Sequence, residues 1–492
     1  MICMFSAIIS SVLNGKAARH VTRAALFVTG ILSAVLLVNT HLSGESFVYY
    51  MGHFPAPWGN EIRAGELEAL MALFISLTAL FSVMAGIQAI VKDIEPDRQN
   101  LYFILVDLMT ASIISMIYTN DLFTGYVFIE INTIAGCGLI MIRQIGKSVV
   151  TAMRYMVISL VGSGLFLIGV TMLYTISGHL LMSNIKDTVE QLTISNDYTV
   201  TLTVIVGLMT VGLAIKSGLF PFHMWIPDAY GYSNVASSSM LSSIVSKGYI
   251  LLLIKIFYRV IGFDFIAKSG ILNILFIFGV TAMIMGSVMA IREDNIRRMI
   301  AYSSVAQIGY IYMGLGLGSA AGTVAALFHI ISHGATKSLL FLASAEFTEG
   351  SHSKKFGELY GKGHVYRVSA LFYSVGAFSM VGFPLLSGFI SKLRFATAAV
   401  SPGPKMIIAL LALAVSTLLN TIYFLRSVIV LYSAKRKSED FKEEYLSGTG
   451  NIKAAKIQYF AATGALAVFN FILGIKAGAI IDIISGGLAI FD

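Results

Sequence analysis

Apolar segments about 20 residues long recur from one end of this chain to the other, and this feature restricts its fold more than any other. A helix of that length crosses the roughly 30 Å of hydrocarbon in a lipid bilayer. Of the 492 residues, 57% are hydrophobic and only 12% are charged, whereas a soluble protein has about 25% charged residues. The sequence therefore predicts an all-α, polytopic membrane protein.

The apolar segments number fourteen, and we expect each to form a membrane-spanning helix. They lie near residues 1–14, 22–42, 67–91, 100–119, 121–142, 152–177, 198–220, 235–261, 270–291, 298–318, 320–347, 367–397, 405–432 and 456–475. Two of them contain glycine and proline at an interior position, in GLFPFHMW (218–225) and in VGFPLLSGF (381–389). Because proline removes a helical hydrogen bond, we expect breaks at Pro221 in the seventh helix and at Pro384 in the twelfth.

The two broken helices are five helices apart, so they start on opposite sides of the membrane. Interrupted helices in corresponding positions are typical of inverted repeats with a transport site between them. We therefore expect two inverted five-helix repeats, made of helices 4–8 and helices 9–13. The corresponding divisions of the chain are 1–99 for the first three helices, 100–262 and 263–432 for the repeats, and 433–492 for a C-terminal loop and the last helix.

Lysine and arginine concentrate in the connections that follow odd-numbered helices. These residues are Lys16, Arg19, Arg23, Arg143, Lys147, Arg154, Arg292, Arg297, Arg298, Lys354, Lys355, Lys362, Arg367, Lys435, Arg436 and Lys437. The positive-inside rule then places both termini outside the cell membrane. Two connections depart from the rule: the one after the seventh helix has His223 and Asp228 but no lysine or arginine, and Arg259 and Lys268 follow the eighth.

Ionisable residues occur inside several of the apolar segments. Asp107 in the fourth helix is a separate departure from the expected apolar pattern. The others are Glu130 in the fifth helix, Lys216 at the end of the first half of the seventh, Lys247 in the eighth, His329, His333 and Lys337 in the eleventh, and Lys392 after the break in the twelfth. A charge at the bilayer centre costs about 2.5–3.5 kcal/mol on insertion scales. Such residues therefore indicate a functional path through the membrane.

In the eleventh helix, His329, His333 and Lys337 are spaced four residues apart, so they form one nearly straight polar stripe with Ser332 and Thr336 beside it. One alternative is a polar seam between packed helices. Another is a zinc or copper site, since two histidines at this spacing can chelate a metal. A convincing third ligand is lacking, so we favour a titrating stripe and expect no metal.

Glu130 and Lys216 are candidates for a buried pair. Burial lowers the pKa of a lysine and a nearby carboxylate raises it, so moving the carboxylate can switch a buried lysine between its charged and neutral forms. Arginine, with a pKa above about 12, could not release its proton in this way. The alternative is a static ion pair.

The chain has only two cysteines, Cys3 and Cys137, and no C-x-x-C motif. This excludes a disulfide framework, a structural zinc site and a cysteine-ligated iron–sulfur cluster. The net charge of +8 is explained by basic loops on one side of a bilayer rather than by nucleic-acid binding. We expect no cofactor in this chain.

Six stretches carry a resemblance to a known family. They are NDLFTGYVFIEI (120–131), AIKSGLFPFHMWIPDA (214–229), SSIVSKGYILLL (242–253), RRMIAYSSVAQIGY (297–310), LFHIISHGATKSLLFL (327–342) and MVGFPLLSGFISKL (380–393). The chain resembles the antiporter-like subunits shared by respiratory complex I (NADH:quinone oxidoreductase), Mrp-type Na⁺/H⁺ antiporters and membrane-bound hydrogenases. The matches follow the family's order over helices 4 to 12.

The resemblance implies a role for each buried group. Glu130 and Lys216 are similar to the gating pair of a half-channel, Lys247 to the relay lysine of the eighth helix, His329 and His333 to the connecting histidines, and Lys392 to the exit lysine. That lysine, the length and GHFPAPWGNEIR (52–63) are most similar to the D-type member of Mrp antiporters and its hydrogenase counterpart. The implied partners are other membrane subunits, further antiporter-like subunits among them, and a peripheral redox module in some complexes.

The expected function is proton translocation along a mid-membrane relay, and the sequence is compatible with H⁺ alone or with Na⁺/H⁺ exchange. One alternative is a redox subunit that binds quinone or haem, which would need facing histidine pairs; we expect His223 and His364 in loops, where they cannot pair with the stripe. A second alternative is a membrane scaffold that transports nothing.

Overall fold

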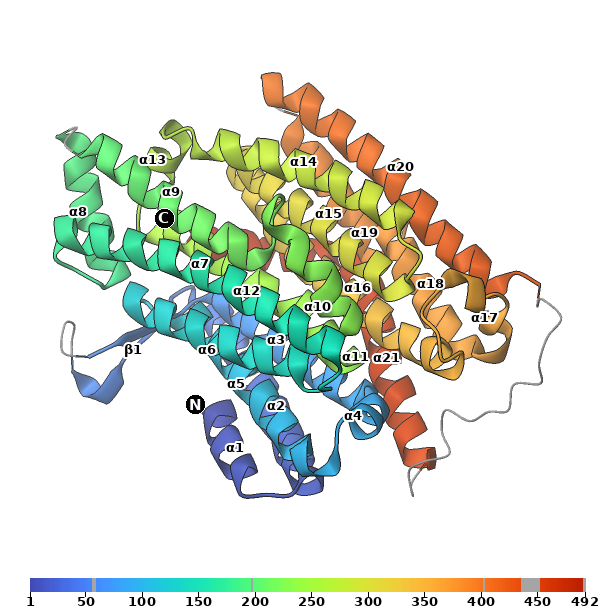
Figure 1. Cartoon of the computed structure of the whole chain (residues 1–492). Helices are drawn as coiled ribbons and strands as arrows, with labels where there is room; N and C mark the ends of the chain where they lie inside the picture. The colour runs from blue at the N-terminus through green and yellow to red at the C-terminus, as the bar shows by residue number, and fades with distance from the viewer. Residues whose placement is uncertain (55–58, 196–197, 401–402, 435–451, 490–492) are drawn as a thin grey trace.

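The computed structural model of the chain describes residues 1–54, 59–195, 198–400, 403–434 and 452–489. Its long helices run side by side in one bundle (Figure 1). The basic residues Lys435, Arg436 and Lys437, which entered the orientation prediction, lie outside the described residues.

The helices in chain order are α1 (Ile2–Ser11), α2 (Gly15–Ser43), α3 (Glu66–Ala85), α4 (Ile87–Asp93), α5 (Gln99–Tyr118), α6 (Leu122–Met141), α7 (Gly146–Ser177), α8 (Met182–Ile194), α9 (Thr199–Ser217), α10 (Ile226–Tyr232), α11 (Val235–Met240), α12 (Ser246–Arg259), α13 (Phe263–Lys268), α14 (Ile271–Arg292), α15 (Ile296–Gly316), α16 (Ala320–Gly350), α17 (Lys362–Val365), α18 (Arg367–Val381), α19 (Ser387–Ala399), α20 (Pro404–Tyr432), α21 (Ile452–Ile475) and α22 (Ala477–Ala489). A 3₁₀ turn, η3 (Phe222–Trp225), precedes α10, and a π-helical turn, η4 (Leu241–Val245), joins α11 to α12. Two short strands, β1 (Phe47–Tyr50) and β2 (Glu61–Ala64), pair antiparallel.

Every predicted apolar segment coincides with helical structure, so the all-α fold is confirmed. Eleven of the described helical stretches are long and apolar enough to cross a membrane by length and composition. Helix α15 is not among them, and its first turn carries Arg297 and Arg298. Helix α1 is short, with 10 residues. The number of fourteen spans and the pair of inverted repeats therefore stay predictions.

Both predicted helix breaks are present. Helix α9 ends at Ser217 and the chain turns through Gly218, whose φ of 78° favours glycine, before Pro221. Helix α18 ends at Val381 and turns through Gly382 at a φ of 95° before α19 begins. In each case a left-handed glycine ends the first half-helix, as expected at a C-terminal cap.

Short elements lie in connections where the sequence predicted only loops. The connection 43–66 contains the β1–β2 hairpin, in which Phe47 is opposite Ala64 and Tyr50 is opposite Glu61. Helix α8 buries Met182, Ile185 and Val189, which are spaced by three and four residues and so share one face. The sequence does show this spacing, but α8 is too short and too polar to be read as a membrane span.

Close backbone contacts hold some neighbouring helices together. Helix α14 packs along α15, and a Cβ atom added at Gly309 would lie 2.6 Å from the carbonyl oxygen of Gly279. In the same way, a Cβ atom at Gly212 in α9 would lie 2.6 Å from the carbonyl oxygen of Gly162 in α7. Small residues at such positions are typical of helix pairs in membranes, where close packing replaces the hydrophobic effect.

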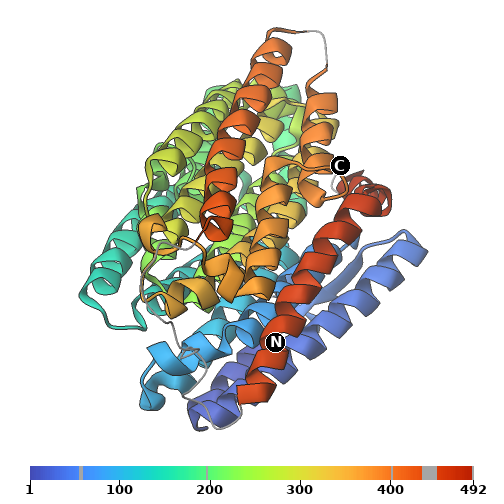
Figure 2. The same cartoon turned by 90° about the vertical axis from the view of Figure 1, so that its right-hand side faces the viewer.

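The C-terminal helices return to the N-terminal part of the molecule. Helices α21 and α22 pack against α3, and α21 also packs against α16 and α19. Figure 2 shows α21 in red between the blue N-terminal helices and the orange helices that precede it in sequence. Side chains from the last long helix can therefore reach the centre of the bundle.

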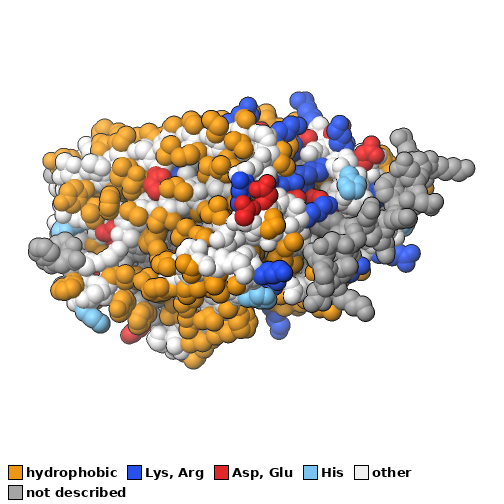
Figure 3. Space-filling view, turned by 60° about the horizontal axis from the view of Figure 1, so that its bottom comes forward, with side chains coloured by type: hydrophobic (Ala, Val, Ile, Leu, Met, Phe, Trp, Pro, Cys, Tyr) orange, Lys and Arg blue, Asp and Glu red, His pale blue; other side chains and the backbone are white. Residues whose placement is uncertain are grey.

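Charged side chains gather at one end of the molecule, while apolar side chains cover most of the remaining face (Figure 3). Ion pairs join the ends of several helices. They are Arg143 with Asp93 (3.2 Å), Arg297 with Glu349 (3.2 Å), and Arg298 with Asp228 (2.6 Å) and Glu293 (2.9 Å). The segments that carry Arg143, Arg297 and Arg298 therefore lie on the same side of the bundle. Their orientation relative to the membrane stays a prediction.

We expect Gly309→Ala to destabilise the protein, because the new methyl group would overlap the carbonyl of Gly279. Overpacking of this kind costs about 1–3 kcal/mol. Gly164→Ala is the matched control, since nothing lies within 4 Å of its Cβ position and alanine is the better helix former. Thermal unfolding of the purified full chain would measure both. Equal melting temperatures for the two variants would contradict close α14–α15 packing.

Candidate functional site

Lys216 lies at the end of α9, immediately before the helix break. It is buried, and its Nζ donates a hydrogen bond of 2.6 Å to Thr133 Oγ1 on α6. The next residue, Ser217, is bonded through its Oγ to Tyr312 OH on α15 at 2.8 Å. The break thus places a buried ammonium group among hydroxyl groups from neighbouring helices.

Glu130 lies on α6, three residues before Thr133, and is partly buried. Its carboxylate acts electrostatically on Lys216, but among the described residues no nitrogen–oxygen contact of 4 Å or less joins the two side chains. The two side chains therefore form no direct salt bridge in this structure, and their functional pairing stays a prediction. Thr133, one helical turn from Glu130 on α6, is the residue that accepts the hydrogen bond from Lys216.

Tyr249 connects Lys216 to the next helix. Its ring centroid on α12 lies 5.8 Å from Lys216 Nζ, and its hydroxyl accepts a hydrogen bond of 3.1 Å from Asn132 Nδ2 on α6. An aromatic face at this range attracts a cation. The side chain of Lys216 is therefore directed between α6 and α12.

Lys247 lies at the start of α12, directly after the π-helical turn η4. Its Nζ donates to the carbonyl oxygen of Ser242 inside that turn, and its side chain is buried. A π turn displaces backbone carbonyls from their usual partners, and such turns are common at functional sites. The irregular turn supplies the oxygen that this buried lysine needs.

The stripe predicted for the eleventh helix is present on α16. The rings of His329 and His333 are stacked, with centroids 5.5 Å apart and planes inclined by 4°. Lys337, one turn further on, donates through Nζ to the carbonyl oxygen of Ile300 at 2.7 Å and also to Ser303 Oγ. All three side chains of the stripe are buried.

Each histidine of the stripe has a different environment. His329 Nδ1 is 2.7 Å from Ser391 Oγ on α19, and its ring stacks on Tyr310 of α15 at 5.7 Å. Neither ring nitrogen of His333 has a hydrogen-bond partner among the described residues. A buried imidazole requires a polar partner, so His333 is suited to bind a water molecule and pass a proton through it.

Lys392 lies on α19, after the second helix break. Its Nζ donates a hydrogen bond of 2.7 Å to the carbonyl oxygen of Val381, the last residue of α18. The carbonyl end of a helix is its negative pole. The second break therefore provides a backbone carbonyl acceptor for Lys392, as the π turn does for Lys247.

The relay candidates form two groups. Glu130 and Lys216 belong to the first, on α6 and α9. The ammonium groups of Lys247, Lys337 and Lys392 all act electrostatically on His329, and these four residues and His333 belong to the second group, on α12, α16 and α19. Lys216, Lys247, His329, His333 and Lys337 are buried, and Glu130 and Lys392 are partly buried. Tyr249, next to Lys216, lies on the same helix as Lys247.

Comparison with known proteins identifies the family of the chain. Residues 119–420 match the family described as NADH:quinone oxidoreductase/Mrp antiporter, transmembrane. This chain belongs to that family. The match begins just before Glu130 and includes both helix breaks, so all the relay candidates lie within it.

Two relatives and one solved structure show what this chain is similar to. The N subunit of the NADH-quinone oxidoreductase of Desulforudis audaxviator is 32% identical over 402 residues, covering 80% of this chain and 77% of the relative. A D-type Na(+)/H(+) antiporter protein of Alkalihalophilus pseudofirmus is 29% identical over 394 residues, covering 79% and 76%. A chain of the Mrp complex from Dietzia sp. DQ12-45-1b has the same fold, with a TM-score of 0.87 at 23% identity and coverage of 100% and 96%.

Members of this antiporter-like family are polytopic membrane proteins, and the predicted family is confirmed. The relatives include both the N type and the D type at similar identity.

His223 is a correction to the sequence prediction. It was expected in a loop, but it is 2% exposed within η3 and its ring stacks on Phe220 at 5.1 Å. The reason is that the helix break turns this segment back into the bundle instead of releasing it to a surface connection. His364, in contrast, is exposed.

Several buried charges were missed or misread from the sequence. Arg259 was read as a loop residue, but it is 4% exposed and 2.6 Å from Glu68 Oε1 at the start of α3. Lys255 is also buried and donates to the carbonyl oxygens of Ile117 (2.7 Å) and Thr119 (2.5 Å). The position of Lys255 inside the eighth apolar segment is the signal that could have identified it.

Asp107, which the sequence placed unexpectedly inside a helix, is fully buried away from the relay. Its Oδ2 accepts hydrogen bonds from Ser6 Oγ (2.6 Å) and Thr22 Oγ1 (2.8 Å). These residues belong to α1 and α2, so Asp107 on α5 connects the first two helices to the bundle. The contacts favour a structural role.

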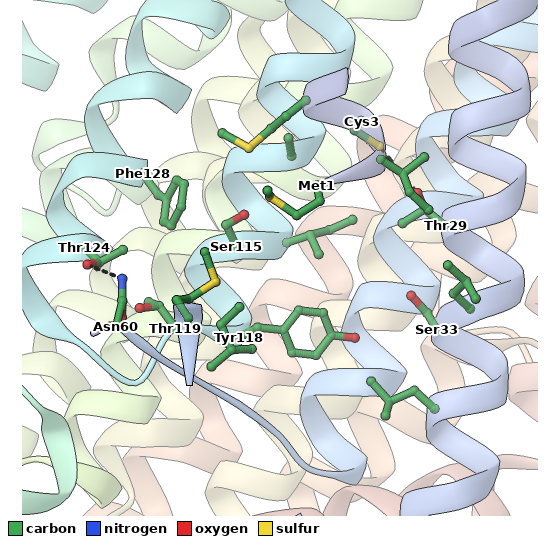
Figure 4. A pocket seen from close by; sticks show the side chains of 18 residues that line it. Met1, Cys3, Thr29, Ser33, Asn60, Ser115, Tyr118, Thr119, Thr124 and Phe128 are labelled. Atoms are coloured by element: carbon green, nitrogen blue, oxygen red, sulfur yellow. Dashed lines mark hydrogen bonds between the residues drawn. The ribbon is translucent and has the colours of Figure 1, made fainter. Parts of the chain in front are cut away.

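A cavity of about 360 Å³ lies between α1, α2, α5 and the region of β2. Figure 4 shows Met1, Tyr118 and Phe128 among its largely apolar lining, with Asn60 donating to Thr124 Oγ1 at 2.6 Å. None of the relay candidates lines it. The candidate site is therefore the line of buried titratable groups and not this cavity.

At the charged end of the bundle, Lys354 is partly buried in the connection after α16. Burial lowers the pKa of Lys354 well below its usual value, and the nearby Arg297 and Arg143 lower it further. Its Nζ donates a hydrogen bond of 2.9 Å to the carbonyl oxygen of Gly231. This hydrogen bond joins the connection after α16 to the end of α10.

We expect Glu68→Ala to destabilise the protein by about 3–5 kcal/mol, because it leaves the buried charge of Arg259 without its carboxylate. Adding Arg259→Met should recover part of the loss, since the buried positive charge is then gone. Glu95→Ala is the control: its ion pair with Arg98 is largely exposed, at 3.5 Å, and should contribute about 0–1 kcal/mol. Thermal unfolding would rank the three variants, and an effect of Glu68→Ala as small as that of Glu95→Ala would contradict the buried pair.

Proposed function

We propose that this chain is a proton-translocating subunit of a multisubunit membrane complex. The protons move along Glu130, Lys216, Lys247, His333, His329, Lys337 and Lys392. The observation that carries the proposal is the alignment of buried titratable groups with interruptions of the helices that bear them. Three of the lysines lie beside such an interruption: Lys216 at the first break, Lys247 at η4 and Lys392 at the second break.

Burying a charged group inside a membrane costs free energy, and irregular backbone there is tolerated only where protein or water hydrogen-bonds to its polar groups. In this chain the buried charged groups and the irregular backbone occur at the same positions. A path for protons uses both, because it needs groups that can change charge and polar atoms or water between them.

Control of the relay begins at Glu130. When its carboxylate is charged it favours the ammonium form of Lys216, on which it acts electrostatically. Protonation of Glu130 by a neighbouring subunit would remove this attraction, so the proton of Lys216 would move inward toward Lys247. Moving one charge against 100 mV requires about 2.3 kcal/mol, which corresponds to a pKa difference of roughly two units.

The relatives support a partnership with other membrane subunits. They are named as subunits of a NADH-quinone oxidoreductase and of a Na(+)/H(+) antiporter. We infer that this chain assembles with further integral membrane subunits, antiporter-like ones among them, and with a peripheral redox module if its complex is of the oxidoreductase type. The redox chemistry would then belong to the partners.

The proposed location is the cytoplasmic membrane, with both termini outside. The common position of Arg143, Arg297 and Arg298 at one end of the bundle supports this orientation. The rival scaffold function is less well supported, because a scaffold gains nothing from lysines held inside the membrane.

Lys216→Ala should lower proton transport by at least about tenfold, because the proton-binding group next to the gate is lost. Lys216→Arg should not restore transport, since arginine does not release its proton. Transport would be measured with the assembled complex in vesicles, and complex assembly by co-purification. Lys268→Ala, at an exposed lysine, is the control. Near-normal pumping by Lys216→Ala would remove this residue from the mechanism.

Thr133→Val should also impair transport, because it removes the hydroxyl that accepts the hydrogen bond from Lys216. The shape of the side chain is kept, so packing should change little. Thr133→Ser retains the hydroxyl and should remain close to the wild type. If both variants pump equally, the Thr133–Lys216 contact is not part of the relay, and the pH profile of transport should then also be unchanged.

A further inference from the structure

Two arginines near the start of α2 have no acidic partner in the part of the chain that the structure describes. Arg19 and Arg23 are four residues apart, so their side chains project from neighbouring turns of one face of the helix. Both side chains are partly buried. Among the described residues, no salt bridge joins either guanidinium group to a carboxylate. We call Arg19 and Arg23 the arginine pair.

Three nitrogens of the arginine pair are enclosed by the protein and have no hydrogen-bond partner among the described residues. They are Nε of Arg19 and both Nε and Nη2 of Arg23. Nε and Nη2 lie on the same edge of a guanidinium group, and that edge can hold two oxygens of a carboxylate or phosphate side by side. A buried polar group requires a partner, so this edge of Arg23 is suited to bind an anion through two hydrogen bonds.

The first turns of α2 concentrate basic side chains. Lys16 precedes the arginine pair on the same helix and is exposed. Arg19 Nη2 is 3.4 Å from His20 Nε2, and Arg19 also acts electrostatically on Arg23. These positive groups repel one another, so an anion placed among them would relieve the repulsion.

The nearest acidic residues are engaged elsewhere or exposed. Asp107 on α5 accepts hydrogen bonds from Ser6 and Thr22. In the turn before α5, Glu95 pairs with Arg98 at 3.5 Å and Asp97 is exposed. The anion that matches the arginine pair is therefore not supplied by the described residues of this chain.

The arginine pair lies where the hydrocarbon of the bilayer begins. From residue 24 to residue 40 the chain has no ionisable side chain. Helix α2 has 29 residues and is therefore about 44 Å long, which exceeds the roughly 30 Å of hydrocarbon. Arg19 is about 6 Å and Arg23 about 12 Å from the start of the helix. The phosphate groups of membrane lipids lie at this boundary, whereas a soluble anion would have to leave water to reach it.

The surface of α2 beyond the arginine pair is apolar and open. Phe27, Ile31 and Val38 are exposed and lie within about 80° of Arg23 around the helix axis. Of the eleven candidate spans among the described residues, α2 is the least buried, at 28%. Figure 2 shows the N-terminal helices in blue at the edge of the bundle. A cationic site with an apolar strip beside it matches the phosphate and the acyl chain of one lipid molecule.

The arginine pair also lies at the charged end of the bundle. A Cβ atom added at Gly15, the first residue of α2, would lie 2.6 Å from Cβ of Gln99 on α5. Gln99 Nε2 in turn donates a hydrogen bond of 3.2 Å to the carbonyl oxygen of Ile94, which follows Asp93, the partner of Arg143. The orientation proposed above assigns this end to the cytoplasmic leaflet, whose surface potential is negative because of its anionic lipids.

From these observations we propose that the arginine pair binds the phosphate group of an anionic phospholipid, with an acyl chain along the exposed apolar strip of α2. Basic pockets at the cytoplasmic side of membrane helices are typical binding sites of anionic head groups. A zwitterionic lipid has the same phosphate, but Lys16 and Arg19 repel its ammonium group. The competing occupant is a carboxylate of a neighbouring subunit, and the apolar strip next to Arg23 favours the lipid.

The test measures lipid binding without transport. The melting temperature of the purified full chain in neutral detergent is compared during titration with phosphatidylglycerol, phosphatidylcholine or inorganic phosphate, because a ligand that binds only the folded state raises the melting temperature. We expect a concentration-dependent rise with phosphatidylglycerol, a much smaller one with phosphatidylcholine and none with inorganic phosphate. Native mass spectrometry of the same sample should detect phosphatidylglycerol retained on the chain.

Variants of Arg23 test the site itself. Arg23→Gln should weaken the apparent affinity for phosphatidylglycerol by about tenfold or more, because two charge-assisted hydrogen bonds are lost. Arg23→Lys keeps the charge but loses the edge that holds two oxygens, so its affinity should fall between those of the wild type and Arg23→Gln. Arg292→Gln is the matched control. It removes the same charge from an exposed arginine at the end of α14, next to the Glu293–Arg298 ion pair of the charged end.

Weaker binding by Arg23→Gln together with unchanged binding by Arg292→Gln would support the lipid site. An equal loss in both variants would show a general effect of surface charge and overturn it, as would a rise that Arg23→Gln leaves unchanged. A rise of the same size with inorganic phosphate would overturn the lipid in favour of a soluble anion. The absence of any rise in the wild type would overturn it in favour of a carboxylate of a neighbouring subunit.

Two measurements keep the test decisive if Arg23→Gln folds poorly. Arg23→Lys retains the positive charge, and wild-type affinity in that variant would contradict the contact of Arg23 with two oxygens. Native mass spectrometry of the wild type needs no variant, and a chain that retains no phosphatidylglycerol would contradict the site. The proton relay is tested separately, since pumping by Lys216→Ala leaves these results untouched.

Discussion

Buried ammonium groups require oxygen atoms, and in this bundle irregular helices supply many of them. Lys247 takes a carbonyl from the π turn, and Lys392 takes one from the end of α18. Lys255 takes two at the end of α5. Inside a regular helix each carbonyl already accepts a hydrogen bond from its own helix, although Ile300 of α15 accepts a further one from Lys337. The helix interruptions therefore lower the free-energy cost of burying these lysines, because they provide hydrogen-bond acceptors for the ammonium groups.

The features that the sequence predicted well are those with local causes. Glycine and proline act on the backbone where they occur, so both breaks could be located within a few residues. The stripe of His329, His333 and Lys337 follows from helical periodicity alone. The all-α fold follows from the length of the apolar segments. The family resemblance added roles to these residues, and the match over residues 119–420 confirmed the family.

The features that the sequence did not predict depend on which helices become neighbours. Nothing in the composition of residues 241–245 indicates a π turn. The hydrogen bond of Lys216 to Thr133 depends on how α9 packs against α6. Arg259 looked like a loop charge because its partner, Glu68, is 191 residues away in the chain. The hydroxyl groups of α16, α18 and α19 that donate to Asn470 of α21 could not be predicted either, since single serines and threonines are common in membrane helices.

The position of Asn470 has a consequence for biosynthesis. Its amide oxygen accepts hydrogen bonds from the hydroxyls of Thr336, Ser379 and Ser387, and it comes from α21, far downstream of α16, α18 and α19. While the ribosome is still producing the earlier helices, these hydroxyls have no common acceptor. The polar centre at the second break is therefore completed only when α21 has entered the bilayer and packed, so that the order of insertion itself delays the closing of this part of the molecule.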